Sequence, residues 1–198
     1  SAFNFAIMRP GRIFTMAGQQ YLYLEDMGSG NHMIIRNEPI RERSFAQQEG
    51  ELTTWYGALA PEVRDIVAPV ASSFMTGNVI DGSVNFTGGT RWLPSNLVAL
   101  SNQDVHQDIT RVVPDGVKRA VALSLADVTR LSGPDLAFPD HAGRVGFNNR
   151  WWWLRTPGAP GNAWLVNSGI YVGQLRGNGG VNLSTAYGGV RPVLIIHQ

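Results

Sequence analysis

Three consecutive tryptophans, Trp151, Trp152 and Trp153, constrain the fold of this chain more than any other feature of its sequence. In an extended segment Trp151 and Trp153 point to one face, and Trp152 points to the other. Each aromatic side chain can bury about 150–250 Å², and a buried indole N–H needs a hydrogen-bond partner. At least one of the three must therefore be buried if the segment lies within a sheet. We predict that residues 151–154 form a strand of the scaffold.

The segment after this strand has the composition of a contact surface. Residues 159–190 hold eight glycines, four asparagines and a single charged side chain, Arg176. Tyr, Trp and Arg provide rigid contact area, and Ser, Gly and Asn provide adaptable hydrogen bonding, as in antibody-like binding surfaces. Gly and Asn are also the residues of β-turns, and on composition alone a set of turns is the commoner explanation.

Two consecutive helices are predicted upstream. The first carries an apolar stripe at helical spacing, and the second begins at Pro61, the residue type favoured at a first helical position, and ends before Pro69. We expect the pair to cover a sheet. The stripe consists of Leu52, Trp55, Tyr56 and Leu59.

The rest of the chain alternates short apolar runs with loops. Ser124 and Asp127 have the spacing of a capping box, which predicts a short helix through Leu131. Residues 76–90 are expected to form a long loop. The pattern predicts one α+β domain over residues 1–198, with the N-terminal strands in about residues 1–50. Strands are expected at residues 3–8, 20–24, 33–35, 119–123, 164–166, 170–172 and 193–196.

Composition excludes several classes of function. The net charge is +1 and charged residues make up 16% of the chain, so no long-range field favours nucleic acid. The absence of cysteine excludes disulfides, thiolate metal sites and cysteine nucleophiles. No apolar run approaches the roughly 20 residues of a membrane span, so direct membrane insertion is not expected. The chain begins at Ser1 rather than Met and resembles an excised fragment, which leaves its compartment open.

Signals for catalysis or metal binding are weak. Asp104, His106 and Asp108 would share one face of a strand, but a solvated polar turn is the commoner explanation of such a triplet. No zinc-protease, phosphate-loop or nucleophile-elbow motif is present. We therefore expect no catalytic residues, no cofactor and no metal.

Two motifs near the C-terminus carry a family resemblance. WWLRTPG at residues 152–158 and GGVRPVLII at residues 188–196 together resemble the signature of a C-type-lectin-like family of bacterial and phage proteins. Residues 52–67 and 119–131 resemble its upstream elements, so the likeness runs from about residue 51 to the end. It implies a C-type-lectin-like fold with short mixed or antiparallel strands, two or three helices and long loops. The motif residues with an implied structural role are Trp151, Trp152, Trp153, Arg155, Pro157, Arg191 and Pro192. The calcium-binding triplets of calcium-dependent lectins are missing.

The same family includes the variable proteins of diversity-generating retroelements. In those proteins, adenine-directed mutagenesis rewrites a C-terminal segment, mostly at asparagine codons. Residues 148–198 resemble such a region, and residues 159–187 resemble the rewritten cassette, in which Lys and Glu, unreachable from those codons, are absent. Trp164 and Gln174 cannot arise from those codons. The candidate template positions are Asn162, Asn167, Asn178 and Asn182.

The resemblance and the composition together predict a non-enzymatic module that binds an unidentified protein or glycan. A structural or receptor-binding tip domain of a phage tail or surface appendage is the alternative, and a glycan-active enzyme comes third. Both leading hypotheses imply a cell-surface, secreted or virion location, with self-association or attachment to a larger surface or virion protein. Trp164, Tyr171, Arg176 and Tyr187 are the predicted anchors. The predicted adaptable contacts are Asn162, Asn167, Ser168, Gln174, Asn178, Asn182 and Ser184.

Overall fold

In the computed structural model, which describes residues 4–74, 77–101 and 104–198, the chain is mostly β, with 33% of residues in strands and 22% in helices. The expectation of an α+β, C-type-lectin-like fold is therefore wrong. The helices predicted from periodicity exist but are short, because glycines and prolines end them, while several sheets hold most of the buried apolar side chains. Helix α1 (Gln48–Gly57) has ten residues, and α2 (Pro61–Asp65) has five.

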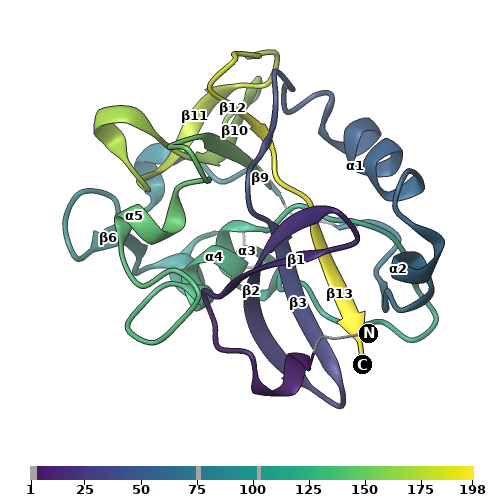
Figure 1. Ribbon diagram of the computed structural model, residues 1–198. Coiled ribbons are helices and arrows are strands. Elements are labelled where there is room, and N and C mark those ends of the chain that lie inside the picture. Colours follow the sequence, from purple (N-terminus) through teal and green to yellow (C-terminus); the bar gives the residue numbers. More distant parts are fainter. Residues whose placement is uncertain (1–3, 75–76, 102–103) are drawn as a thin grey trace.

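The first sheet is antiparallel, in the order β1-β2-β3-β13. Its bounds are Ile13–Met16 (β1), Gln19–Gly28 (β2), Asn31–Arg36 (β3) and Val193–His197 (β13). Two-residue turns with positive φ at both positions join β1 to β2 and β2 to β3, and such turns match the twist of paired strands. The last strand of the chain thus completes a sheet that the N-terminal strands begin (Figure 1).

The second sheet has the order β11-β10-β9-β12-β4. Only the pairing of β12 with β9 is parallel among these neighbours. The sheet is built almost entirely from the C-terminal part of the chain, and it lies beside the first sheet (Figure 1). The bounds are Trp151–Pro157 (β9), Asn162–Val166 (β10), Leu175–Gly180 (β11), Gly188–Val190 (β12) and Ile40–Arg41 (β4).

Side chains bury both faces of the first sheet. One face carries Tyr21 and Ile34 and packs against Leu52 of α1 and Val63 of α2. The predicted pair of helices therefore does cover a sheet.

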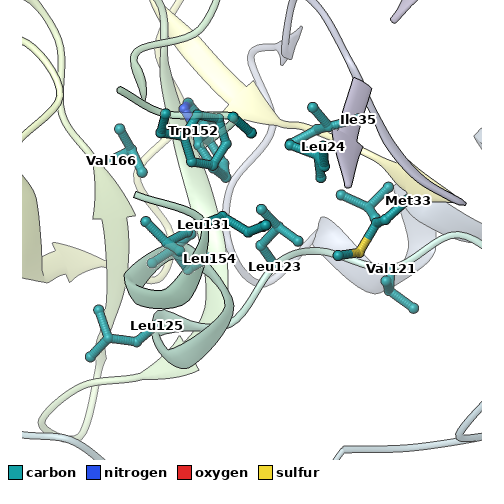
Figure 2. Close-up of a cluster of buried hydrophobic side chains, with 14 of the residues drawn as sticks. Leu24, Met33, Ile35, Val121, Leu123, Leu125, Leu131, Trp152, Leu154 and Val166 are labelled. Carbon is teal, nitrogen blue, oxygen red and sulfur yellow. The ribbon is translucent and has the colours of Figure 1, made fainter. Parts of the chain in front are cut away.

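The opposite face of the first sheet packs against helix α4 (Leu125–Leu131) and β9. Figure 2 shows Trp152 and Leu154 of β9 with Leu125 and Leu131 of α4 in this cluster, beside Met33 of β3. Trp152 and Leu154 thus join the second sheet to the core of the molecule.

The capping box predicted from the sequence is present, whereas three of the predicted strands are not. The capping box of α4 is confirmed, since the Ser124 hydroxyl accepts from the Asp127 N–H and the Asp127 carboxylate accepts from the Ser124 N–H. The strand expected at residues 3–8 is wrong where it can be assessed, because residues 5–7 form a 3-10 turn and residue 3 lies outside the described residues. Residues 119–123 are largely buried but make only an isolated bridge through Val121. Residues 170–172 belong to a turn rather than a strand.

Short elements complete the chain. The remaining strands are β5 (Pro69–Val70), β6 (Phe86–Thr87), β7 (Leu93–Pro94) and β8 (Val117–Lys118). The remaining helices are α3 (Asp104–Gln107) and α5 (His141–Arg144), with 3-10 turns η1 (Phe5–Ile7), η2 (Asp81–Ser83), η3 (Leu97–Ala99) and η4 (Gly169–Tyr171).

Candidate binding surface

Several of the predicted contact residues lie at one end of the strands of the second sheet. Val166, near the end of β10, pairs with Leu175 of β11 and with Trp152 of β9, and Gly188 of β12 pairs with Trp151. This register brings the 167–174 turn and the residues before β9 and β12 to the same end of the sheet. We define this edge surface by its partly or fully exposed side chains, Asn149, Asn167, Ser168, Ile170, Tyr171, Gln174, Arg176 and Tyr187.

Arg176 contacts two other side chains of the edge surface, those of Tyr171 and Gln174. The Arg176 guanidinium carbon lies 5.2 Å from the centre of the Tyr171 ring, within the range of a cation–π interaction. Arg176 Nη2 also donates a hydrogen bond of 3.1 Å to Gln174 Oε1. Tyr171 remains 46% exposed. The cluster therefore holds a planar cation and a tyrosine in a defined arrangement that still faces solvent.

The edge surface continues onto residues that the sequence hypothesis did not include. Ile170 is 89% exposed, although it is apolar and was placed in a strand. Asn149 Oδ1 accepts a hydrogen bond of 3.2 Å from the Gly169 N–H, which ties the turn before β9 to the 167–174 turn. The flanking Gly169 and Gly173, both with positive φ, were the signal that residues 170–172 form a turn rather than a strand.

Trp164 is not a surface anchor, and that prediction is wrong. Its side chain is fully buried, and its Nε1 donates a 2.9 Å hydrogen bond to the Val79 carbonyl. Strand β10 lies between β9 and β11, and apolar side chains cover both of its faces. An aromatic residue on an inner strand of this kind is used for packing, and a ligand cannot reach it.

The remaining predicted contacts lie outside the three-residue cluster. Tyr187 is 67% exposed and precedes β12 at the edge surface. Asn178 is exposed on β11, the edge strand, while Asn162 is half-buried at the start of β10, at the opposite end of the sheet. Asn182 and Ser184 are exposed on the loop between β11 and β12. The structure therefore does not bring all the predicted contacts together, since Asn162 lies away from the edge surface.

The loop formed by residues 181–187 covers the second face of the sheet. Trp151, Trp153 and Leu165 form a buried cluster there, against which Val181 packs. Trp151 Nε1 donates a 3.0 Å hydrogen bond to Thr185 Oγ1. The packing of Val181 and the hydrogen bond of Thr185 thus hold the loop against the tryptophans, while Asn182 and Ser184 remain exposed.

Glycines of the segment are fixed by packing. A Cβ on Gly173 would stand 2.1 Å from the His141 carbonyl oxygen, and its φ of +71° disfavours any side chain. A Cβ on Gly158 would stand 2.3 Å from the Gly177 carbonyl oxygen. Backbone atoms cannot move aside as a flexible side chain can. These positions therefore belong to the scaffold rather than to a changeable surface.

Arg155 forms a buried charge cluster behind the sheet. Its guanidinium pairs with Asp108 at 2.6 Å and with Asp127 at 3.4 Å, and its Nη1 donates to Thr110 Oγ1 and to the Ala122 carbonyl. The structural role that the motif implies for Arg155 is therefore to hold two carboxylates and a backbone carbonyl. The cluster joins β9 to the start of α4.

The other motif residues also lie in the scaffold. Trp151 and Trp153 face one cluster and Trp152 the other, as the alternation predicted. The guanidinium carbon of Arg191 lies 5.0 Å from the centre of the Trp152 ring, so the two motifs meet in space. The carbonyl of Pro157 accepts from the Val79 N–H and that of Pro192 from the Arg36 N–H.

The acidic and histidine residues around position 106 do not form the ligand set considered above. Residues 104–107 are helical rather than extended, so the alternation of a strand that would have aligned the three residues is absent, and Asp108 is paired with Arg155. Over residues 4–74, 77–101 and 104–198, no group of three or more His, Asp or Glu side chains is arranged to hold a metal ion.

Comparison with known proteins places the chain in a family. A family model described as "Domain of unknown function (DUF6273)" matches residues 20–198, which is most of the chain. The chain belongs to this family. No curated protein and no solved structure matches it. The relation of this DUF6273 chain to retroelement variable proteins therefore stays a prediction. No helix within its described residues is long and apolar enough to cross a membrane.

Proposed function

We propose that this DUF6273 chain is a ligand-binding module whose contact surface is the edge surface around Tyr171, Gln174 and Arg176. The observation that carries the proposal is that Arg176 contacts the side chains of both Tyr171 and Gln174 while Tyr171 stays exposed. Tyrosine and arginine are the residue types that dominate binding energy at interfaces. Their preorganisation lowers the entropy that a ligand's binding would cost.

A protein is the favoured ligand class. Ile170 precedes Tyr171 in the chain and is 89% exposed, so the edge surface offers an apolar contact next to an aromatic one. An apolar contact beside a tyrosine and an arginine suits a protein surface better than a uniformly hydroxylated glycan. The glycan remains the second class to be tested.

We further propose that the 159–187 segment is diversified, as in variable proteins of diversity-generating retroelements. All four asparagines of the segment are exposed or half-buried, whereas its tryptophan is fully buried. Rewriting the asparagines would therefore change the surface and spare the core. A gene with a near-identical neighbouring repeat should differ from it at adenines only. A repeat with mismatches at all four bases would contradict the proposal, as would the absence of any repeat.

The binding proposal is tested with the purified chain on protein and glycan arrays. The wild-type chain should bind at least one array feature that the Tyr171→Ala/Arg176→Ala double variant does not bind. The melting temperature should be unchanged, because both side chains are partly exposed. Leu183→Ala, at an exposed position of the 181–187 loop, is the matched control and should keep binding. A double variant that unfolds would instead give the segment a structural role.

The alternative, an assembly domain of a tail or surface appendage, predicts a different result. In that case the edge surface would be buried against another copy or a neighbouring protein of a larger assembly. Light scattering after size exclusion would then report an oligomer that Ile170→Asp dissociates. A monomer that binds an array feature would favour the ligand-binding module.

A further inference from the structure

A pocket of about 540 Å³ adjoins the edge surface at Asn149, which belongs to both. One wall is formed by Pro10 and Gly11 with Ile13, the first residue of β1, and the other is the 136–149 segment. Phe147 and Leu136 of this second wall are both between a third and a half exposed. The volume lies within the range of small-molecule sites, about 300–1,000 Å³.

The inner end of the pocket is formed by buried residues. Leu22, Asn37 and Arg191 line it, and all three are nearly inaccessible to solvent. Arg191 is the one ionisable residue among the described residues that line the pocket, so no carboxylate of the lining balances its charge. The pocket is therefore apolar along its walls and positively charged at its base.

One guanidinium nitrogen of Arg191 makes no hydrogen bond with the described residues. Its Nε donates to the Arg36 carbonyl at 2.7 Å and its Nη2 to the Asn37 carbonyl at 2.9 Å. Its Nη1 is buried and has no hydrogen-bond partner within the described part of the chain. An unsatisfied buried donor costs about 1–3 kcal/mol, and more when it is charged.

Two other arginines with buried side chains, Arg144 and Arg155, lack this feature. Every guanidinium nitrogen of Arg144 donates a hydrogen bond, to the Gly173 carbonyl, the Ser132 hydroxyl or the Arg91 carbonyl. Arg155 is balanced by two carboxylates. Arg191 combines a guanidinium nitrogen that has no hydrogen-bond partner among the described residues with a place in the lining of the pocket.

The charge of Arg191 is already disfavoured by its surroundings. Burial, with a smaller contribution from the like charge of Arg36, lowers the pKa of Arg191 to about 9. The side chain stays protonated at neutral pH because this value still lies above 7. An anion entering the pocket would offset both the burial and the repulsion.

We infer that this pocket binds an organic carboxylate with an apolar body, the carboxylate directed to Arg191 and the body lying against Phe147, Leu136 and Ile13. A guanidinium forms charge-assisted hydrogen bonds with a carboxylate, and the apolar walls bury the rest of the ligand. Such a ligand could be a free small acid or the C-terminus of a peptide that ends in an apolar residue. The inference does not rest on the function proposed for the edge surface.

Calorimetry with octanoate and octanol tests the inference on the purified chain. Octanoate should bind about 10- to 100-fold more tightly than octanol, because the alcohol lacks the charge-assisted hydrogen bonds. The Nε–Hε resonance of Arg191 should shift on titration with octanoate and stay in place with octanol. Equal affinities, or no saturable binding of octanoate at millimolar concentration, would overturn the inference.

Variants locate the site without disturbing Arg191. Phe147→Ala should weaken octanoate binding severalfold, whereas Leu183→Ala, at a similarly exposed position outside the pocket, should leave it unchanged. Equal weakening in both variants would also overturn the inference. Tyr171→Ala should not affect octanoate, so this result is separable from the array experiment.

A peptide pair identifies the source of the carboxylate. A short peptide ending in leucine is compared with the same peptide carrying a C-terminal amide. Binding of the free acid form alone, at an affinity above that of octanoate, assigns the site to a peptide C-terminus. Tighter binding of octanoate assigns it to a small acid. Equal binding of the acid and the amide would contradict recognition of a carboxylate.

Discussion

The indole ring of Trp164 occupies the space beside Gly177, where an added Cβ would stand 2.3 Å from the ring. Real Cβ atoms do not approach other heavy atoms so closely, so the strand must carry glycine at this point. Such glycines let a large aromatic side chain lie flat against the neighbouring strand. A Cβ on Gly188 would likewise stand 2.2 Å from the Trp151 ring of the neighbouring strand, and one on Gly179 would stand 2.6 Å from Leu165 and 2.8 Å from the Trp153 ring.

Gly177→Ala should therefore lower the free energy of unfolding by about 1–3 kcal/mol, the usual cost of overpacking a close-packed site. Trp164 is fully buried and cannot swing aside. Gly180→Ala is the control in the same strand, since a Cβ there would meet no atom within 4 Å. Urea denaturation of both variants makes the measurement. Equal destabilisation would show that strand propensity, rather than the tryptophan, governs these positions.

Trp164→Ala should destabilise the fold by about 3–5 kcal/mol, because it leaves a large cavity and an unpaired Val79 carbonyl. Tyr187→Ala should stay within about 0.5 kcal/mol of wild type, since its side chain is mostly exposed. Thermal and urea unfolding of the two variants give the comparison. A Trp164→Ala variant as stable as the wild type would show that this side chain is not needed for packing and would make it a candidate ligand contact again.

Arg155→Met should cost about 3–5 kcal/mol, because it leaves the buried carboxylates of Asp108 and Asp127 without their cation. Arg176→Met is the control, since Arg176 is partly exposed. Circular dichroism melting curves would report the difference. An Arg155→Met variant as stable as Arg176→Met would mean that the ion pairs are dispensable.

Stability should fall as the pH is lowered from 7 to 5, in part through His32. Burial lowers the pKa of His32 below its ordinary value of 6.5, and its ring nitrogen shares a 2.7 Å hydrogen bond with the Tyr23 hydroxyl. Below pH 6.5 the unfolded chain therefore binds a proton that the folded chain does not, which favours unfolding. His32→Gln should flatten this part of a urea-midpoint profile against pH. An unchanged slope in the variant would assign the effect to other groups.

Predictions that depend only on residues close together in the sequence were confirmed. The alternation of Trp151, Trp152 and Trp153 follows from strand geometry, and the Ser124 capping box requires only a three-residue spacing. The exposure of Tyr171 and Tyr187 was also consistent with the composition of the segment. Each of these depends on chemistry within a few residues.

Features that depend on the order of the strands in a sheet could not be predicted from the sequence. Trp164 is buried because β10 became an inner strand, and composition cannot distinguish an inner strand from an edge strand. The pocket at Arg191 requires residues 10, 37, 136 and 147 to meet, and no local pattern encodes such distant contacts. The expected fold class was wrong because the helices with clear sequence signals are only ten, five and seven residues long, whereas strands hold 33% of the residues.

The central claim is that the C-terminal segment combines a fixed scaffold with a changeable surface. Two display libraries test it most directly, one randomised at exposed positions and the other at the glycines that pack against tryptophans or the backbone. Members of the first library should mostly resist proteolysis and yield binders to an arbitrary protein target, whereas members of the second should mostly be cleaved. Equal proteolysis of the two libraries would contradict the claim. The first library covers Tyr171, Gln174, Arg176, Asn178, Asn182, Ser184 and Tyr187, and the second covers Gly158, Gly173, Gly177, Gly179 and Gly188.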